Sequence, residues 1–169
     1  AIPVVVDAVM KGTPGIDPER ALAACVASAT TSHPGSPFDV WEKYGYMPED
    51  LQSQSVSITL EQAYDDWCVA QLAKKLGHDD IYERFPRRAR YFRNLYNADN
   101  GFFQGRTSDG KWLEPFDPLR YGANRGNPYT EGNAWQYSWY VPHDIEGLIE
   151  LMGGKRKFVE RLDRFFTLT

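Results

Sequence analysis

A helix-length segment over residues 59–76 is apolar on almost every face, and this feature constrains the fold of the chain most strongly. A helix in water normally keeps one polar face, so a helix that is apolar all round is buried between other helices. Thr59 and Gln62 have the spacing of a capping box at its start, and Gly77 is a typical residue beyond its end. The segment therefore predicts a central helix that is enclosed by others.

Shorter apolar stripes, with spacings of three and four residues, predict the helices that surround it. Asp17, Pro18 and Glu19 form a typical helix start, with a cap, a first-turn proline and a first-turn acid. The predicted helices cover residues 18–30, 80–96, 145–152 and 158–166. Pro86 should kink or break the second of these helices.

Stretches rich in proline, glycine and asparagine over residues 31–57 and 114–130 predict two long loops. Between them, Asp109-Gly110 is a typical hairpin turn, and short strands are expected over residues 101–106 and 111–113. Helices that are joined by long loops, with only one small hairpin, indicate an all-α fold of antiparallel helix pairs.

Charge and composition exclude several classes of function. A net charge of −4 and a pI near 5.4 disfavour nucleic-acid binding, which requires clustered basic side chains. No apolar run approaches the roughly 20 residues that a membrane-spanning helix needs. Cys25 and Cys68 have no cysteine or histidine partner at the spacing of metal ligands, so we predict two buried free thiols and no metal site in this chain.

Asp65 and Asp66 interrupt the apolar central helix. Buried carboxylates must be paired, hydrogen-bonded or protonated, because an isolated charge is costly in an apolar interior. The two residues are therefore either structural anchors, which we favour, or substrate-binding residues in a polar site at the helix end. The sequence leaves both interpretations open.

Glu131 lies where a long polar loop meets the expected start of a helix. From its position alone, the simplest interpretation is a first-turn glutamate that interacts favourably with the helix dipole. Alternatively, aromatic neighbours such as Trp135 and Trp139 desolvate its carboxyl group and keep it protonated, as a general acid requires. A glycosidase needs a second carboxylate as well, and none is obvious in the sequence.

The residues from Thr130 to Tyr137 read Thr-Glu-Gly-Asn-Ala-Trp-Gln-Tyr, which is a highly specific motif. Further motifs are Ala-Tyr-Asp-Asp-Trp at 63–67, Gly-Arg at 105–106, Asp-Gly-Lys-Trp at 109–112, Val-Pro-His-Asp at 141–144 and Met-Gly-Gly at 152–154. Together they closely resemble glycoside hydrolase family 92 over the whole chain. Members of this family are calcium-dependent, exo-acting α-mannosidases of bacteria that invert the anomeric configuration.

The resemblance implies that residues 1–169 are a fragment of one helical catalytic domain, part of an (α/α)6 toroid. It assigns Glu131 as the general acid and places Trp135 and Gln136 near the sugar pocket. The family's catalytic base, an aspartate in a Gly-Asn-Asp motif, and its calcium-associated Asn-Glu-Pro-Ser-His-His motif do not occur here. We therefore expect the base, the calcium ligands, an N-terminal β-sandwich domain and the C-terminal part of the catalytic domain outside this chain. We also expect the isolated fragment to be inactive.

The resemblance further implies mannose-containing glycans as partners, hydrolysis of terminal α-mannosides, with α-1,2 linkages expected, and a periplasmic or secreted location. Two alternatives to an α-mannosidase stay open. The chain could belong to a degenerate toroid, which would be a non-catalytic helical domain for sugar binding or scaffolding. It could also belong to a glucosidase with a related toroid fold.

Overall fold

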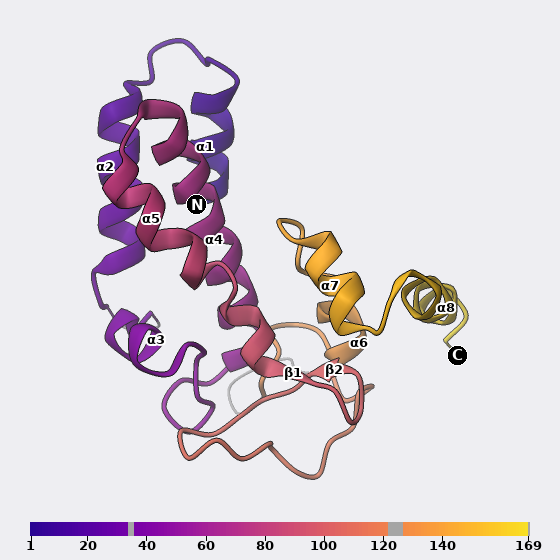
Figure 1. The fold of residues 1–169 in the computed structure, drawn as a ribbon. Helices are drawn as coiled ribbons and strands as arrows, with labels where there is room; N and C mark the ends of the chain where they lie inside the picture. The colour runs from indigo at the N-terminus through magenta and orange to yellow at the C-terminus, as the bar shows by residue number, and fades with distance from the viewer. Residues whose placement is uncertain (34–35, 122–126, 169) are drawn as a thin grey trace. The chain divides into compact units, whose positions relative to one another are not determined.

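The computed structural model describes residues 1–33, 36–121 and 127–168. These residues are mostly helical, with one short antiparallel two-stranded sheet among them (Figure 1). The all-α fold class predicted from the sequence is confirmed. The chain forms two compact units, the first comprising Ala1–Met47 and Ile58–Phe92, and the second comprising Pro48–Ser57 and Arg93–Thr169.

The first unit is built from helices that lie side by side (Figure 1). They are α1 (Ile2–Met10), α2 (Pro18–Thr30), α3 (Phe38–Tyr44), most of α4 (Ser55–Leu76) and α5 (Asp79–Arg88). The start of α2 is the one expected from the sequence, because the Asp17 carboxylate accepts hydrogen bonds from the backbone N–H groups of Glu19 and Arg20.

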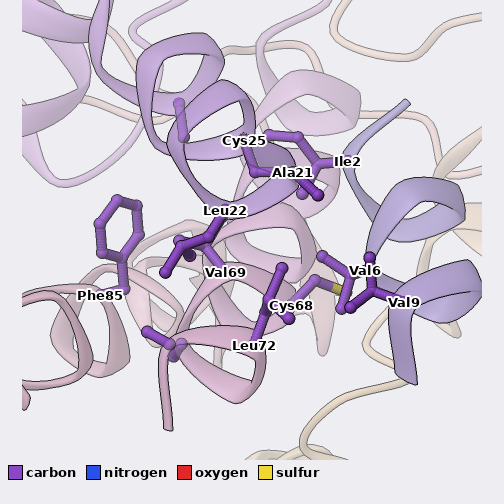
Figure 2. Packing of buried hydrophobic residues seen from close by; sticks show 13 residues of the cluster. Ile2, Val6, Val9, Ala21, Leu22, Cys25, Cys68, Val69, Leu72 and Phe85 are labelled. Atoms are coloured by element: carbon purple, nitrogen blue, oxygen red, sulfur yellow. The ribbon is translucent and has the colours of Figure 1, made fainter. Parts of the chain in front are cut away.

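The core of the first unit gathers apolar side chains from α1, α2, α4 and α5 (Figure 2). α4 provides the largest share, which confirms the predicted central helix. Both thiols lie in this cluster as free cysteines, also as predicted. The members of the core are Ile2, Val6, Val9, Ala21, Leu22, Cys25, Ala29, Cys68, Val69, Ala70, Leu72, Ala73 and Phe85.

Three predicted helix boundaries are wrong. α4 begins at Ser55, and Thr59 lies inside it with its Oγ1 accepting a 2.9 Å hydrogen bond from the Met47 backbone N–H, so it caps no helix. The short helix α3 lies within the stretch expected to be a loop. The helix predicted over residues 80–96 ends at Arg88, and Pro86 lies inside it, close to its C-terminal end.

The second unit holds the remaining regular elements. They are β1 (Tyr96–Asn97), β2 (Phe102–Phe103), α6 (Ala134–Tyr137), α7 (Ile145–Leu151) and α8 (Lys155–Phe166), and the 3-10 turn η1 (Tyr91–Leu95) leads into them. α7 begins as expected, with the Asp144 carboxylate accepting a 2.9 Å hydrogen bond from the Gly147 backbone N–H.

The two-stranded sheet lies just before the predicted hairpin. Tyr96 pairs with Phe103 and Asn97 pairs with Phe102, so the strands flank the turn at Gly101, whose φ is 77°. The predicted segment around Asp109-Gly110 is also paired, by a bridge between Arg106 and Trp112 and by backbone hydrogen bonds of 2.9 Å from Thr107 to Lys111 and from Leu113 to Gly105. The regular strands carry the buried Phe102 and Phe103, whereas residues 106–113 are mostly half-buried.

Candidate active site around Glu131

Glu131 lies in the loop before α6 and is exposed, so the interpretation in which Trp135 and Trp139 bury its carboxyl group is wrong for the described part of this chain. Its backbone φ of 47° is in the left-handed region, which costs a residue with a Cβ about 1–2 kcal/mol. The N-cap of α6 is Asn133, so Glu131 precedes the helix and is not the first-turn glutamate of the simplest sequence interpretation. Backbone strain of this kind concentrates at functional sites, where the surrounding structure holds it in place.

The residues before Glu131 are fixed to the first turn of α4, which belongs to the same unit. The Pro128 carbonyl accepts hydrogen bonds from the backbone N–H groups of Val56 and Ser57, at 3.0 and 3.3 Å. The backbone N–H of Thr130 donates to Ser57 Oγ at 2.8 Å. The first N–H groups of a helix have no partner within it, and here the loop that leads to Glu131 supplies partners.

The residues after Glu131 are fixed by α6. Asn133 and Gln136 form a capping box, in which each side chain bonds the backbone N–H of the other residue, at 3.1 and 3.0 Å. The hydroxyl of Tyr137 donates to the Thr130 carbonyl at 2.9 Å. Glu131 therefore sits between two anchored peptide segments.

The other residues of the motif have different surroundings. Trp135 is buried, its ring 5.1 Å from that of Phe102 and under the guanidinium of Arg161 at 4.9 Å. With these two side chains it lines an open cavity of about 620 Å³. Gln136 is exposed, but its Oε1 accepts the hydrogen bond from the Asn133 N–H. That oxygen is therefore occupied by the capping box. Binding of substrate by Gln136 stays a prediction, and it would use the N–H groups of the side-chain amide.

Asp66 lies in the first unit as the centre of a buried ion pair. Its two oxygens accept hydrogen bonds from Arg88 Nε at 2.8 Å, from a terminal nitrogen of Arg88 at 2.9 Å and from Trp41 Nε1 at 3.1 Å. Both charged side chains are 1% exposed. Burial raises the pKa of the Asp66 carboxyl, and the charge of Arg88 opposes this rise. The geometry gives Asp66 the role of a structural anchor, because its oxygens are occupied inside the unit.

Asp65 is only half-buried. Burial raises the pKa of its carboxyl to about 6, and the negative charge of Glu61 adds to this rise. A carboxyl group with this pKa gains or loses its proton near neutral pH. This property fits a substrate-binding residue and a structural residue equally well. The prediction that Asp65 contacts substrate therefore stays a prediction.

Sequence reasoning missed Ser57 and the position of the Tyr137 hydroxyl, which hold the two peptide groups on either side of Thr130. Ser57 is 73 residues from its partner Thr130, and no local pattern announces such a contact. It also missed a second cavity in the same unit, of about 170 Å³, which Gln104, Glu114, Phe116, Arg120 and Tyr129 help to line.

Across residues 1–33, 36–121 and 127–168, no group of three or more histidine, cysteine, aspartate or glutamate side chains could hold a metal ion. In the same part of the chain, none of the helices has the length and apolar character needed to cross a membrane.

Comparisons with known proteins place the chain among the glycosidases. The profile of the glycosyl hydrolase family 92 catalytic domain matches residues 1–169. The chain belongs to glycosyl hydrolase family 92. A protein of Arthroderma benhamiae described as a secreted glycosidase is 33% identical, and the match covers 73% of this chain and 19% of that protein.

Two solved structures are similar over almost all of the chain. The α-mannosidase BT3965 of Bacteroides thetaiotaomicron, solved with mannoimidazole, is 40% identical with a TM-score of 0.92, over 99% of this chain. The inverting mannosidase BT2199 of the same species is 38% identical with a TM-score of 0.88, over 96% of this chain. In each case the chain spans 22% of the length of the matched protein.

Proposed function

We propose that the protein to which this chain belongs hydrolyses terminal α-mannosides, with Glu131 as the general acid. The observation that carries this proposal is the exposed carboxyl group of Glu131 on a left-handed backbone that neighbouring elements hold on both sides. The family of the chain and the α-mannosidases that it resembles support the choice of substrate.

In this mechanism, Glu131 gives its proton to the glycosidic oxygen as the bond to the leaving group breaks. A carboxylate on the opposite side of the sugar removes a proton from the attacking water, which inverts the configuration at the anomeric carbon. In inverting glycosidases the two carboxyl groups stand about 6.5–9.5 Å apart. We assign the base to an aspartate elsewhere in the protein, so the isolated chain should have no turnover.

The remaining parts of the proposal rest on the family alone. We propose mannose-containing glycans as substrates, α-1,2 linkages as the preferred bond, and a location in the periplasm or outside the cell. The description of the A. benhamiae relative as secreted supports this location. We also propose a bound calcium ion, held by residues outside this chain, because the family's calcium-associated Asn-Glu-Pro-Ser-His-His motif does not occur in this sequence.

The role of Glu131 is tested by Glu131→Gln in the full-length protein. Protonation helps a poor leaving group to depart and is dispensable for a good one. We therefore expect turnover of an alkyl or disaccharide mannoside to fall by about 10²–10⁴-fold, and that of 2,4-dinitrophenyl mannoside to fall far less. Glu146→Gln, at an exposed glutamate of the same unit, is the matched control and should change neither rate.

Equal losses for the two substrates would contradict the assignment of Glu131 as the acid. Binding of mannose by the full-length protein without any turnover would instead favour a non-catalytic sugar-binding domain. Cleavage of glucosides in preference to mannosides would favour a toroid glucosidase.

A further inference from the structure

We propose that Tyr137 and Ser57 are positioning residues, which hold the two peptide groups on either side of Thr130 and so aim the carboxyl group of Glu131 at the leaving-group oxygen. The inference rests on the proposed function, since it presumes that Glu131 is the acid. Neither residue needs to touch the substrate for this role.

The first step concerns the carbonyl of Thr130. This carbonyl and the backbone nitrogen of Glu131 belong to one planar peptide group. The hydroxyl of Tyr137 bonds the carbonyl at 2.9 Å, and Ser57 Oγ accepts the preceding N–H at 2.8 Å. The plane from which Glu131 projects is thus fixed at both ends of Thr130.

The second step concerns Gly132, on the other side of Glu131. A Cβ at this position would lie 3.1 Å from Gln136 Oε1 and 3.1 Å from Tyr137 Cε2, so the backbone packs closely against both side chains. Tyr137 therefore restrains Glu131 twice, through its hydroxyl before the residue and through its ring after it.

The third step concerns the conformation that these contacts hold. With φ at 47°, Glu131 is in a well that a free chain rarely populates, and without the contacts it would relax to an extended or helical conformation. Such a rotation of the backbone redirects the side chain. A misplacement of about 1 Å is enough to cost an enzyme on the order of a hundredfold in rate.

The experiment is Tyr137→Phe in the full-length protein, assayed with a poor and an activated leaving group. The variant keeps the ring against Gly132 and loses only the hydrogen bond to the Thr130 carbonyl. We expect kcat/KM for the poor leaving group to fall about tenfold, and that for 2,4-dinitrophenyl mannoside to fall less than about twofold. A residue that only stabilises the fold would change both substrates alike.

Tyr129→Phe is the matched control. Tyr129 is buried in the same unit, and its hydroxyl also donates to a backbone carbonyl, that of Phe103. Tyr129→Phe removes a hydroxyl group, as Tyr137→Phe does, but leaves the peptide group of Glu131 unchanged. Both substrates should therefore be cleaved at the rates of the unchanged protein. If Tyr137→Phe does not fold, Ser57→Ala makes the same test. Its control is Ser138→Ala, at another buried serine, whose hydroxyl donates to the Ala134 carbonyl.

The outcomes separate the two proposals. A loss confined to the poor leaving group supports positioning, whereas equal losses, or no loss, in Tyr137→Phe overturn it. If Glu131→Gln is selective for the poor leaving group and Tyr137→Phe is not, only the positioning role fails. If Glu131→Gln shows no selectivity, Glu131 is not the acid and both proposals fall.

Discussion

The buried ion pair of Arg88 and Asp66 gives the sharpest prediction for stability. Arg88 donates four hydrogen bonds of 2.7–2.9 Å, two to Asp66, one to Glu42 and one to the Ala29 carbonyl. In Arg88→Met, Asp66 keeps only Trp41 as a partner in a site that is almost closed to water. Removing one member of a buried pair costs about 3–5 kcal/mol, because the other charge stays behind.

The ionisation of Asp66 sets the ceiling of this loss. The variant can escape the buried charge by protonating the carboxyl. At pH 7.5 this costs at most about 5 kcal/mol relative to an ordinary pKa near 3.9, and less because burial already raises the pKa of Asp66 in the unchanged protein. At pH 5 the same protonation costs only about 1.5 kcal/mol. The destabilisation by Arg88→Met should therefore shrink by about half or more between pH 7.5 and pH 5.

Hydrogen exchange of the α4 and α5 amides in the full-length protein measures this loss locally. At pH 7.5, a loss of 3–5 kcal/mol speeds exchange by roughly two to four orders of magnitude. Arg84→Met is the matched control, since Arg84 also pairs with Glu42, at 2.9 Å, but is 52% exposed. A surface pair of this kind contributes about 1 kcal/mol or less.

A double variant measures how much of the loss comes from the unpaired charge of Asp66. Asp66→Asn together with Arg88→Met removes both charges and leaves an amide oxygen for Trp41, so it should be more stable than Arg88→Met alone at pH 7.5. Protection that falls no further in Arg88→Met than in Arg84→Met would refute the reasoning, and so would a loss independent of pH.

Two further predictions concern titration and the metal. Burial raises the pKa of Asp65 to about 6, so its ionisation should cost stability as pH rises from about 4 to about 6. Asp65→Asn should then gain about 1–3 kcal/mol in the exchange of α4 amides at pH 7.5 and nothing at pH 4, and a variant less stable at pH 7.5 would contradict this. Chelation should abolish mannoside hydrolysis by the full-length protein and calcium should restore it, whereas full activity in EDTA would exclude a calcium requirement.

Helices α2, α4 and α5 of the first unit were predictable because their apolar periodicity survives in the fold, whereas α3 was not and lies in a predicted loop. The start of α4 was not, because distant backbone groups decide it. Thr59 and Gln62 have the spacing of a capping box, yet Thr59 bonds Met47, and the helix begins four residues earlier, where Glu49 accepts the N–H of Ser55. Such tertiary partners override local signals for helix ends.

The candidate site was predictable only in part. A specific motif pointed to Glu131, whereas its left-handed backbone had no signal, since glycine and asparagine are the usual residues in that region. Trp135 was expected at a sugar pocket; its ring packs against Phe102 and lines a cavity with it, and its contact with a sugar stays a prediction. Which face a side chain takes depends on contacts that sequence spacing does not specify.

The strain at Glu131 is itself an argument about function. Glycine at this position would adopt a φ of 47° at no steric cost, so the glutamate forgoes about 1–2 kcal/mol of stability. Two hydrogen bonds of Thr130 offset that cost, each by about 0.5–1.5 kcal/mol net. Its carbonyl accepts from the Tyr137 hydroxyl, and its N–H donates to Ser57 Oγ. A fold that needed only a turn here would gain from glycine and would need no such anchors. The arrangement is explained if a carboxyl group is required at this point of the loop and in this direction.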